Sequence, residues 1–337
     1  MTLKLSLTAA LGLATALTAL PATADVNIYS YRQQELIQPL LDAFTEETGI
    51  ATNVAFLDKG MVERLQAEGD RSPADVVLTV DISRLAELVD AGVTQPVDSE
   101  VLSAQIPSEF RDPGNEWFGL TTRARIVYAS KERVAEGEVT TYEDLVDPKW
   151  KGRICIRSGT NAYNVALTAA VLHHHGEEGA TAWLEGVKAN LARKPQGNDR
   201  GQVKAIWAGE CDISLGNTYY MGAMLADEEQ KEWADSVRIE FPTFEDGGTH
   251  MNVSGMAMTK AAPNRDEALA FMEFLASDTA QAIYAEAVNE FPVKEDVPNS
   301  ALVESWGSFT PDDVNLMDIA GLRPDALKLI QIVDFDG

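Results

Sequence analysis

The chain has 337 residues, which is more than one hydrophobic core usually supports, so we expect two domains. Its 53 acidic and 27 basic side chains give a formal net charge of −26. This charge excludes nucleic acids and anionic membranes as partners attracted by the general field of the protein.

The first 24 residues have the pattern of a secretory signal peptide. Lys4 supplies a positive charge, residues 11–20 form an apolar stretch, and residues 22–24 (Ala-Thr-Ala) form a cleavage site before Asp25. The apolar stretch is too short for a membrane span, and no later segment is apolar enough for one. We therefore expect a soluble protein, a monomer, outside the cytoplasm in a bacterial periplasm.

Strands and helices alternate along the first third of the mature chain. Periodicity and stop signals predict strands at 26–30, 52–56 and 75–80, and helices at 34–48, 61–69 and 83–91. This alternation is typical of a largely parallel, doubly wound α/β sheet.

Two extended segments, 117–130 and 251–258, divide the rest of the chain. Between them the pattern predicts helices at 163–175, 178–192 and 199–208 and a strand at 213–215; after them it predicts helices at 264–275, 278–287 and within 311–331. We expect two lobes joined by two crossover strands around a hinged cleft. The N-terminal lobe would comprise 25–123 plus about 249–298, and the C-terminal lobe about 124–248 plus about 299–337.

Three tyrosines are the candidate site. Tyr219 and Tyr220 are adjacent in one segment, and Tyr163 lies in another. Both segments have small polar residues before the tyrosine and an apolar helical run after it. Such phenol oxygens would lie at helix N-termini, where negative charge is favoured. A phenolate near neutral pH needs a strong partner, and a hard trivalent cation is one. Convergence of the three would make a ferric-iron site; the competing interpretation is amphipathic packing at a core edge.

The chain contains two cysteines, Cys155 and Cys211. In an exported protein an isolated pair favours a disulfide, and a soft metal site would need further thiols or histidines at ligand spacing. Each cysteine lies eight residues before a tyrosine, Tyr163 or Tyr219. A bridge would therefore hold the two tyrosine-bearing segments side by side.

The layout resembles the bacterial periplasmic solute-binding proteins of ABC importers. More narrowly, it is similar to the periplasmic ferric-iron-binding protein family, whose fold is like a single transferrin lobe. The segments that carry the resemblance are 26–32, 72–81, 117–125, 155–159, 161–164, 191–197 and 216–220. The resemblance implies a type II-like, two-lobed binding protein, without enzymatic turnover, that delivers iron to an inner-membrane ABC permease.

In that family the matching tyrosines, here Tyr163, Tyr219 and Tyr220, coordinate Fe³⁺. Some members add a histidine from the first strand–helix turn, where this chain has Gln33. The resemblance therefore implies three tyrosines completed by a small anion, with carbonate the usual one. Three phenolates neutralise Fe³⁺, so a carbonate would leave about two negative charges in need of cations.

Arg32 and Arg123 lie in segments that match the family and are our candidates for the anion site, because guanidinium groups bind oxyanions in a bidentate manner. Arg125 would share a strand face with Arg123. Tyr31 could also reach the cleft. For each arginine a surface salt bridge is the competing interpretation.

Other features point away from a site. Consecutive side chains on a helix cannot converge on one ion, so we interpret His173 to His175 as a solvated helix end, and the pair Asp312 and Asp313 as solvated helix charges. Two other functions stay open: binding of an organic anion or polyamine, and a tyrosine-ligated iron enzyme. The sequence has no Gly-x-Ser-x-Gly elbow, His-Glu-x-x-His motif or phosphate-binding glycine loop to support an enzyme.

Overall fold

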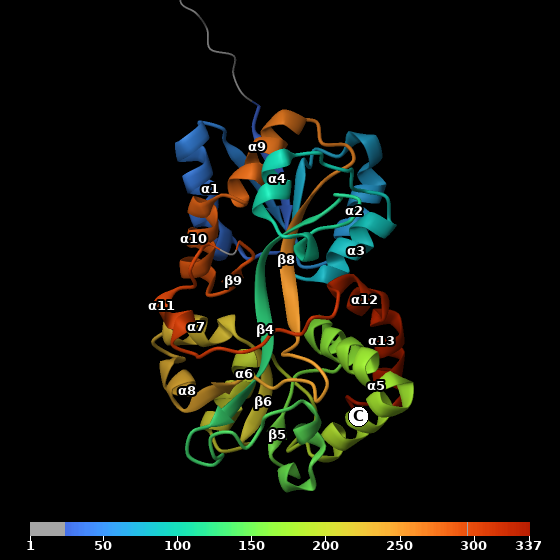
Figure 1. Cartoon of the computed structure of the whole chain (residues 1–337), viewed down its shortest axis with the longest axis vertical. Helices are drawn as coiled ribbons and strands as arrows, with labels where there is room; N and C mark the ends of the chain where they lie inside the picture. Colours follow the sequence, from blue (N-terminus) through green and yellow to red (C-terminus); the bar gives the residue numbers. More distant parts are fainter. Residues whose placement is uncertain (1–23, 295) are drawn as a thin grey trace, which may run out of the picture.

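Two lobes lie one above the other along the long axis of the molecule (Figure 1). The computed structural model describes residues 24–294 and 296–337. The expected signal peptide, residues 1–24, thus lies outside the described residues except for Ala24. Within the described part of the chain, no helix combines the length and apolarity needed to cross a membrane.

The upper lobe in Figure 1 contains the first third of the described chain and a later helical pair. Its elements are β1 (Val26–Ser30), α1 (Gln34–Thr48), β2 (Thr52–Phe56), α2 (Met61–Glu68), β3 (Val76–Thr79), α3 (Ile82–Asp90), α4 (Glu100–Gln105), α9 (Arg265–Leu275) and α10 (Asp278–Val288). Strand β1 pairs in parallel with both β2 and β3. The sequence-based bounds of β1, α1 and β2 are confirmed to the residue.

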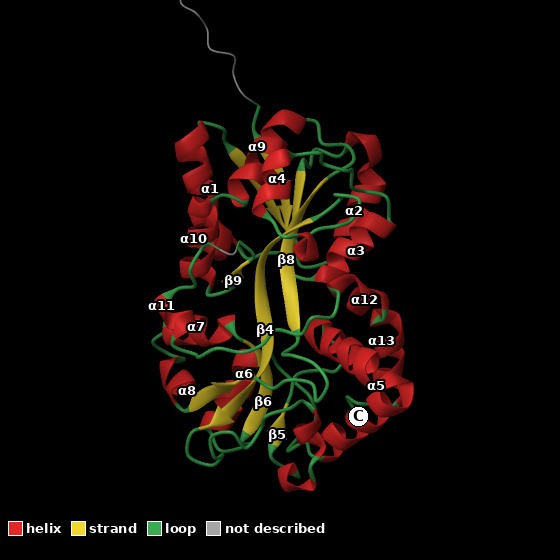
Figure 2. Ribbon diagram, in the orientation of Figure 1, coloured by secondary structure: helices red, strands yellow, loops and turns green. Residues whose placement is uncertain are grey.

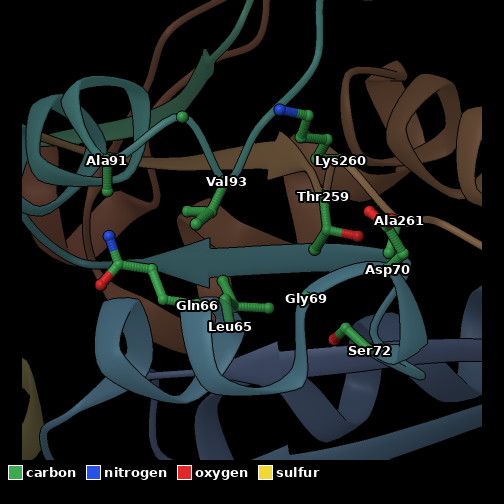
Figure 3. A pocket seen from close by; sticks show the side chains of 11 residues that line it. Leu65, Gln66, Gly69, Asp70, Ser72, Ala91, Val93, Thr259, Lys260 and Ala261 are labelled. Carbon is green, nitrogen blue, oxygen red and sulfur yellow. The ribbon is translucent and has the colours of Figure 1, made fainter.

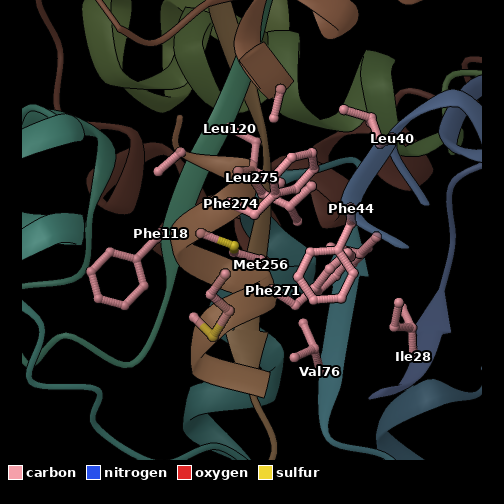
Figure 4. Packing of buried hydrophobic residues seen from close by; sticks show 14 of the residues in the cluster. Ile28, Leu40, Phe44, Val76, Phe118, Leu120, Met256, Phe271, Phe274 and Leu275 are labelled. Atoms are coloured by element: carbon pink, nitrogen blue, oxygen red, sulfur yellow. The ribbon is translucent and has the colours of Figure 1, made fainter. Parts of the chain in front are cut away.

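The core of this lobe forms where helices α1 and α9 cover the sheet (Figure 4). The ring of Phe44 meets Phe271 edge-on at 5.0 Å and Phe274 at 5.4 Å, and Met256 from the sheet lies in the same cluster. The apolar residues of α1 recur every three to four positions, so that one helix face is buried here.

The lower lobe holds the middle of the chain and its C-terminal helices. Its elements are β5 (Ile154–Cys155), α5 (Ala162–Ala189), α6 (Asp199–Trp207), β6 (Ile213–Asn217), α7 (Tyr219–Leu225), α8 (Lys231–Asp235), β7 (Val237–Glu240), α11 (Ala301–Glu304), α12 (Leu316–Gly321) and α13 (Arg323–Ile332). Gly176, at φ 66°, breaks α5 where the sequence predicts a boundary between two helices.

Two long strands, β4 (Phe118–Ser130) and β8 (Met251–Met258), join the lobes (Figure 2). Strand β4 pairs antiparallel with β8 and with the short β9 (Phe291–Pro292), and farther along with β6 and β7 in the lower lobe. All thirteen residues of β4 are buried. The two-lobed α/β architecture with two crossover strands is confirmed.

The expected parallel pairing is confirmed for β1, β2 and β3, the strands from which it was predicted, but it does not extend to the strands that join the lobes. The order of paired strands is β2-β1-β3-β8-β4-β6-β5, with β7 and β9 also on β4, and every pairing of β4 and β8 is antiparallel. The chain returns through the crossover in the opposite direction, and this reverses the local pairing.

His173 is exposed as expected, but His174 and His175 on α5 are not a solvated helix end. His174 is 6% exposed, with Nδ1 2.8 Å from Asp246 and Nε2 2.9 Å from Asp312, and its ring stacks on Phe244 at 4.0 Å. His175 contacts Glu143. Asp312 is only 5% exposed, so it is not an ordinary solvated charge either. The partners come from distant parts of the chain, which helical periodicity cannot show.

Candidate metal centre

The three predicted tyrosines lie at the starts of two helices in the lower lobe. Tyr163 is in the first turn of α5, whose cap residue Asn161 accepts a hydrogen bond from the backbone N–H of Tyr163 at 3.1 Å. Tyr219 is the first residue of α7, directly after strand β6 and Thr218. Both positions confirm the expectation that the phenols lie at helix N-termini.

The structure brings these phenols together. The hydroxyl of Tyr219 donates to the hydroxyl of Tyr163 at 3.2 Å and accepts from Asn217 Nδ2 at 3.3 Å. The rings of Tyr219 and Tyr220 are 4.3 Å apart. The three phenols lie at the starts of α5 and α7, and together their oxygens form a donor set of hard ligands.

Burial makes these phenols poor acids. Desolvation, followed by the neighbouring phenols Tyr163 and Tyr220, raises the pKa of Tyr219 well above its ordinary value. Desolvation and the nearby Tyr163 and Asp199 likewise raise the pKa of Tyr220. Near neutral pH these two hydroxyls are protonated, so a cation must displace protons to bind them.

A cleft of about 500 Å³ opens over these phenols and is lined by both lobes. The upper lobe contributes Tyr31 and Gln33, next to the first helix, together with a second segment at residues 287–290. Tyr31 is fixed there because its hydroxyl accepts from the backbone N–H of Met61 at 2.9 Å, and Arg84 lies 3.9 Å from its ring centroid.

Arg32 lines this cleft but is already engaged by a carboxylate. Its two terminal nitrogens donate to Glu290 at 3.0 and 2.8 Å, and one of them also contacts Ser254. Although burial disfavours both charges, the pairing holds the pKa of Arg32 above and that of Glu290 below their ordinary values. An anion at Arg32 would share the guanidinium with Glu290.

Arg123 and Arg125 occupy the same stretch of β4 but have different partners. Arg123 donates to the Val80 carbonyl and to Ser254, and lies 3.8 Å from Asp81. Arg125 donates to Asp199 at 2.7 Å. Both guanidinium groups lie near the Tyr163 ring, at 6.0 and 5.9 Å from its centroid.

Sequence reasoning missed four charged residues of this site, one of which is Arg200 in the lining of the cleft. Glu290 pairs with a residue 258 positions away, so no local pattern could reveal it. Arg157 lines the cleft, and Asp199 is completely buried behind it. Only Arg157 could have been predicted from the sequence, because it lies between strand β5 and the start of α5, close to Tyr163 along the chain.

Cys155 and Cys211 form the expected disulfide, with their Cα atoms 5.8 Å apart. Strands β5 and β6 pair in parallel at this point, with Cys155 opposite Ser214. Each strand leads into one of the tyrosine-bearing segments, so the bridge and the strand pair hold the two segments next to each other, as the spacing predicts.

A second, smaller pocket lies in the upper lobe (Figure 3), and no tyrosine lines it. Its volume is about 220 Å³, and its walls include Leu65, Val93 and Thr259 with the charged Asp70 and Lys260 at its edge. It contains none of the predicted site residues. Within residues 24–294 and 296–337, no group of three His, Cys, Asp or Glu side chains is placed to hold a metal ion.

Comparisons with known proteins agree with this geometry. The family described as bacterial extracellular solute-binding protein matches residues 71–310. Iron uptake protein A1 of Synechocystis is 44% identical over 309 residues, covering 91% of this chain and 86% of the relative.

Solved structures extend the comparison to the whole fold. The apo ferric ion-binding protein A of Pasteurella haemolytica is 52% identical with a TM-score of 0.90, covering 94% of this chain and 99% of that one. A Trichodesmium protein solved with iron and citrate is 41% identical with a TM-score of 0.87, covering 93% and 99%. The chain therefore belongs to the bacterial extracellular solute-binding proteins, and its resemblance to the ferric-iron-binding members of that family is confirmed.

Proposed function

We propose that this protein captures ferric iron through the phenolates of Tyr163, Tyr219 and Tyr220. The observation that carries the proposal is the 3.2 Å contact between the Tyr163 and Tyr219 hydroxyls, at two helix N-termini inside the inter-lobe cleft. Hard oxygen donors suit Fe³⁺, and the relatives named above are iron-uptake and ferric-iron-binding proteins.

A small anion completes the coordination sphere in this proposal, and carbonate is our choice. Arg32 and Arg123 would hold it, sharing their guanidinium groups with Glu290 and Asp81. Tyr31 and Gln33 line the upper-lobe side of the cleft and would shape it rather than bind the metal, whereas Arg125 is buried near the Tyr163 ring. Citrate, which accompanies iron in the Trichodesmium structure, is the alternative anion to carbonate.

Iron capture is coupled to lobe closure and to transport. The N-terminal lobe (25–123 plus about 249–298) and the C-terminal lobe (about 124–248 plus about 299–337) would close on the ion, because contacts made only in the closed state favour it. The closed, monomeric protein would work in the periplasm, after loss of residues 1–24, and dock on an inner-membrane ABC permease. It would bind and release iron without chemical turnover.

The test is a visible absorption titration of the mature protein with ferric iron, with and without bicarbonate. We expect a phenolate-to-iron charge-transfer band that saturates at about one iron per chain. It should disappear in the double variant Tyr219→Phe, Tyr220→Phe, and weaken without bicarbonate. Saturating iron without any band would overturn the ferric assignment and favour an organic anion or polyamine in the cleft.

A further inference from the structure

Asp199 is a buried carboxylate behind the tyrosines, and it bonds to every segment that carries them. It is the first residue of α6 and has no exposed surface. Its Oδ2 accepts from Arg125 Nη1 at 2.7 Å and from the backbone N–H of Asn217 at 3.2 Å. Its Oδ1 accepts from Arg157 Nη1 at 3.1 Å.

Two of these bonds connect Asp199 to the segments that carry Tyr219 and Tyr163. Asn217, which Asp199 holds by its backbone, donates from its side chain to the hydroxyl of Tyr219. Arg125, held by the same carboxylate oxygen, donates at 2.7 Å to the side chain of Asn164, the residue after Tyr163. One carboxylate therefore links the ends of the two helices whose tyrosines must converge.

The third bond, from Arg157, affects the charge around Tyr163. The guanidinium carbon of Arg157 is 5.3 Å from the centroid of the Tyr163 ring, and that of Arg125 is 5.9 Å away. Both cations would stabilise a phenolate at Tyr163, and Asp199, shared between them, offsets part of their positive field. A carboxylate at this point thus sets how strongly the phenolate donates to a metal.

We propose that Asp199 is a positioning residue of the iron site, which aligns the two tyrosine-bearing segments and balances Arg125 and Arg157, two of the three arginines near the Tyr163 ring. The inference rests on the proposed ferric function and concerns how the metal's ligands are oriented and tuned by groups behind them. Removing such an outer partner typically costs about 10–100-fold in metal affinity.

The experiment compares three variants of the mature protein loaded with ferric iron in bicarbonate buffer. Asp199→Asn keeps the size of the side chain and removes its charge. Arg157→Gln removes one of the two cations that pair with Asp199, and the Arg157 side chain is 15% exposed. The matched control is Asp75→Asn, since Asp75 is equally buried and is hydrogen-bonded by Asn27 and Asn264 in the upper lobe.

The charge-transfer band is the readout that a merely structural role would not move. In Asp199→Asn the uncompensated arginines lower the energy of the phenolate electrons, so we expect the band at shorter wavelength and iron bound about 10–100-fold more weakly. Arg157→Gln should move the band the opposite way, to longer wavelength. Asp75→Asn should leave both the band and the affinity at their wild-type values.

The outcomes separate this inference from the proposed function. A wild-type protein without any band would refute the ferric site itself. A normal wild-type band that neither Asp199→Asn nor Arg157→Gln moves would overturn the role of Asp199, as would an affinity loss no larger than that of Asp75→Asn. If Asp199→Asn does not fold, the direction of the Arg157→Gln shift decides: longer wavelength supports the proposal, and an unmoved band rejects it.

Discussion

Replacing Gly222 by alanine should weaken iron binding through the packing between the two lobes. Gly222 lies on α7, and its nearest neighbour is the side chain of Asn289, which ends α10 in the upper lobe. A Cβ atom added to Gly222 would lie 2.4 Å from Nδ2 and 2.5 Å from Cγ of Asn289. Real Cβ atoms do not approach so closely, so either Asn289 or the lobes must move.

The cost should fall on the arrangement of the lobes that brings α7 against α10, as in this structure. Overpacking of this kind typically costs about 1–3 kcal/mol, and a penalty of that size on the binding-competent state lowers affinity by about 5–150-fold. The iron-free protein should not be destabilised, because alanine is a better helix former than glycine by about 1 kcal/mol. Affinity and stability should therefore change independently.

The assay is iron titration in competition with a chelator, together with the radius of gyration from X-ray scattering with and without iron. A second substitution, Asn289→Gly, should restore affinity, since it removes the clash and glycine tolerates the φ of 56° at that position. The control is Gly321→Ala on α12, where an added Cβ meets nothing within 4 Å. Wild-type affinity in Gly222→Ala, or no rescue by Asn289→Gly, would refute this reasoning.

Three further predictions concern stability. Replacing Cys155 and Cys211 by alanine should lower the free energy of unfolding by about 4 kcal/mol, as expected for a cross-link over 56 positions, and denaturant unfolding that matches the wild type would contradict it. Burial and two neighbouring arginines lower the pKa of His250 to about 3. Between that pH and the ordinary His pKa of about 6.5, the unfolded chain is protonated at this residue and the folded protein is not. The free energy of unfolding should fall by about 1.4 kcal/mol for each unit by which the pH is lowered across that window. A His250→Gln variant with the same slope in urea unfolding would exclude this residue as the cause. His174→Leu should cost about 1–3 kcal/mol because it removes the hydrogen-bond partner of Asp312 Oδ2, which is buried, whereas the double change with Asp312→Leu should recover part of that loss; unchanged melting of the single variant would contradict this.

The sequence was sufficient for features that depend on near neighbours along the chain. Helix α1 was predictable because apolar residues recur at helical spacing and Gly49 ends it in the left-handed conformation. The placement of Tyr163 and Tyr219 at helix starts followed from the polar residues before them. The disulfide followed from the cysteine count and the export context.

Features that depend on long-range contacts could not be predicted in the same way. The pairing of Arg32 with Glu290 joins residues 258 positions apart, and nothing near either residue indicates it. Asp199 carries no motif, and its burial depends on how α6 packs behind β6 and β4. The direction of β4 against β8 was equally hidden, because an apolar strand reads the same in parallel and antiparallel pairs.

The antiparallel crossover also orders events during folding. Strand β3 needs β8 as its sheet neighbour, and Val76 pairs with Met258 only after the intervening lower-lobe sequence has been synthesised. Closing such a long stretch of chain is entropically costly, so folding of the upper lobe should be slow compared with that of a domain made from one contiguous segment. For the same reason, neither lobe can be obtained intact by cutting the gene once: an isolated upper lobe would require joining β4 directly to β8 through a new short turn.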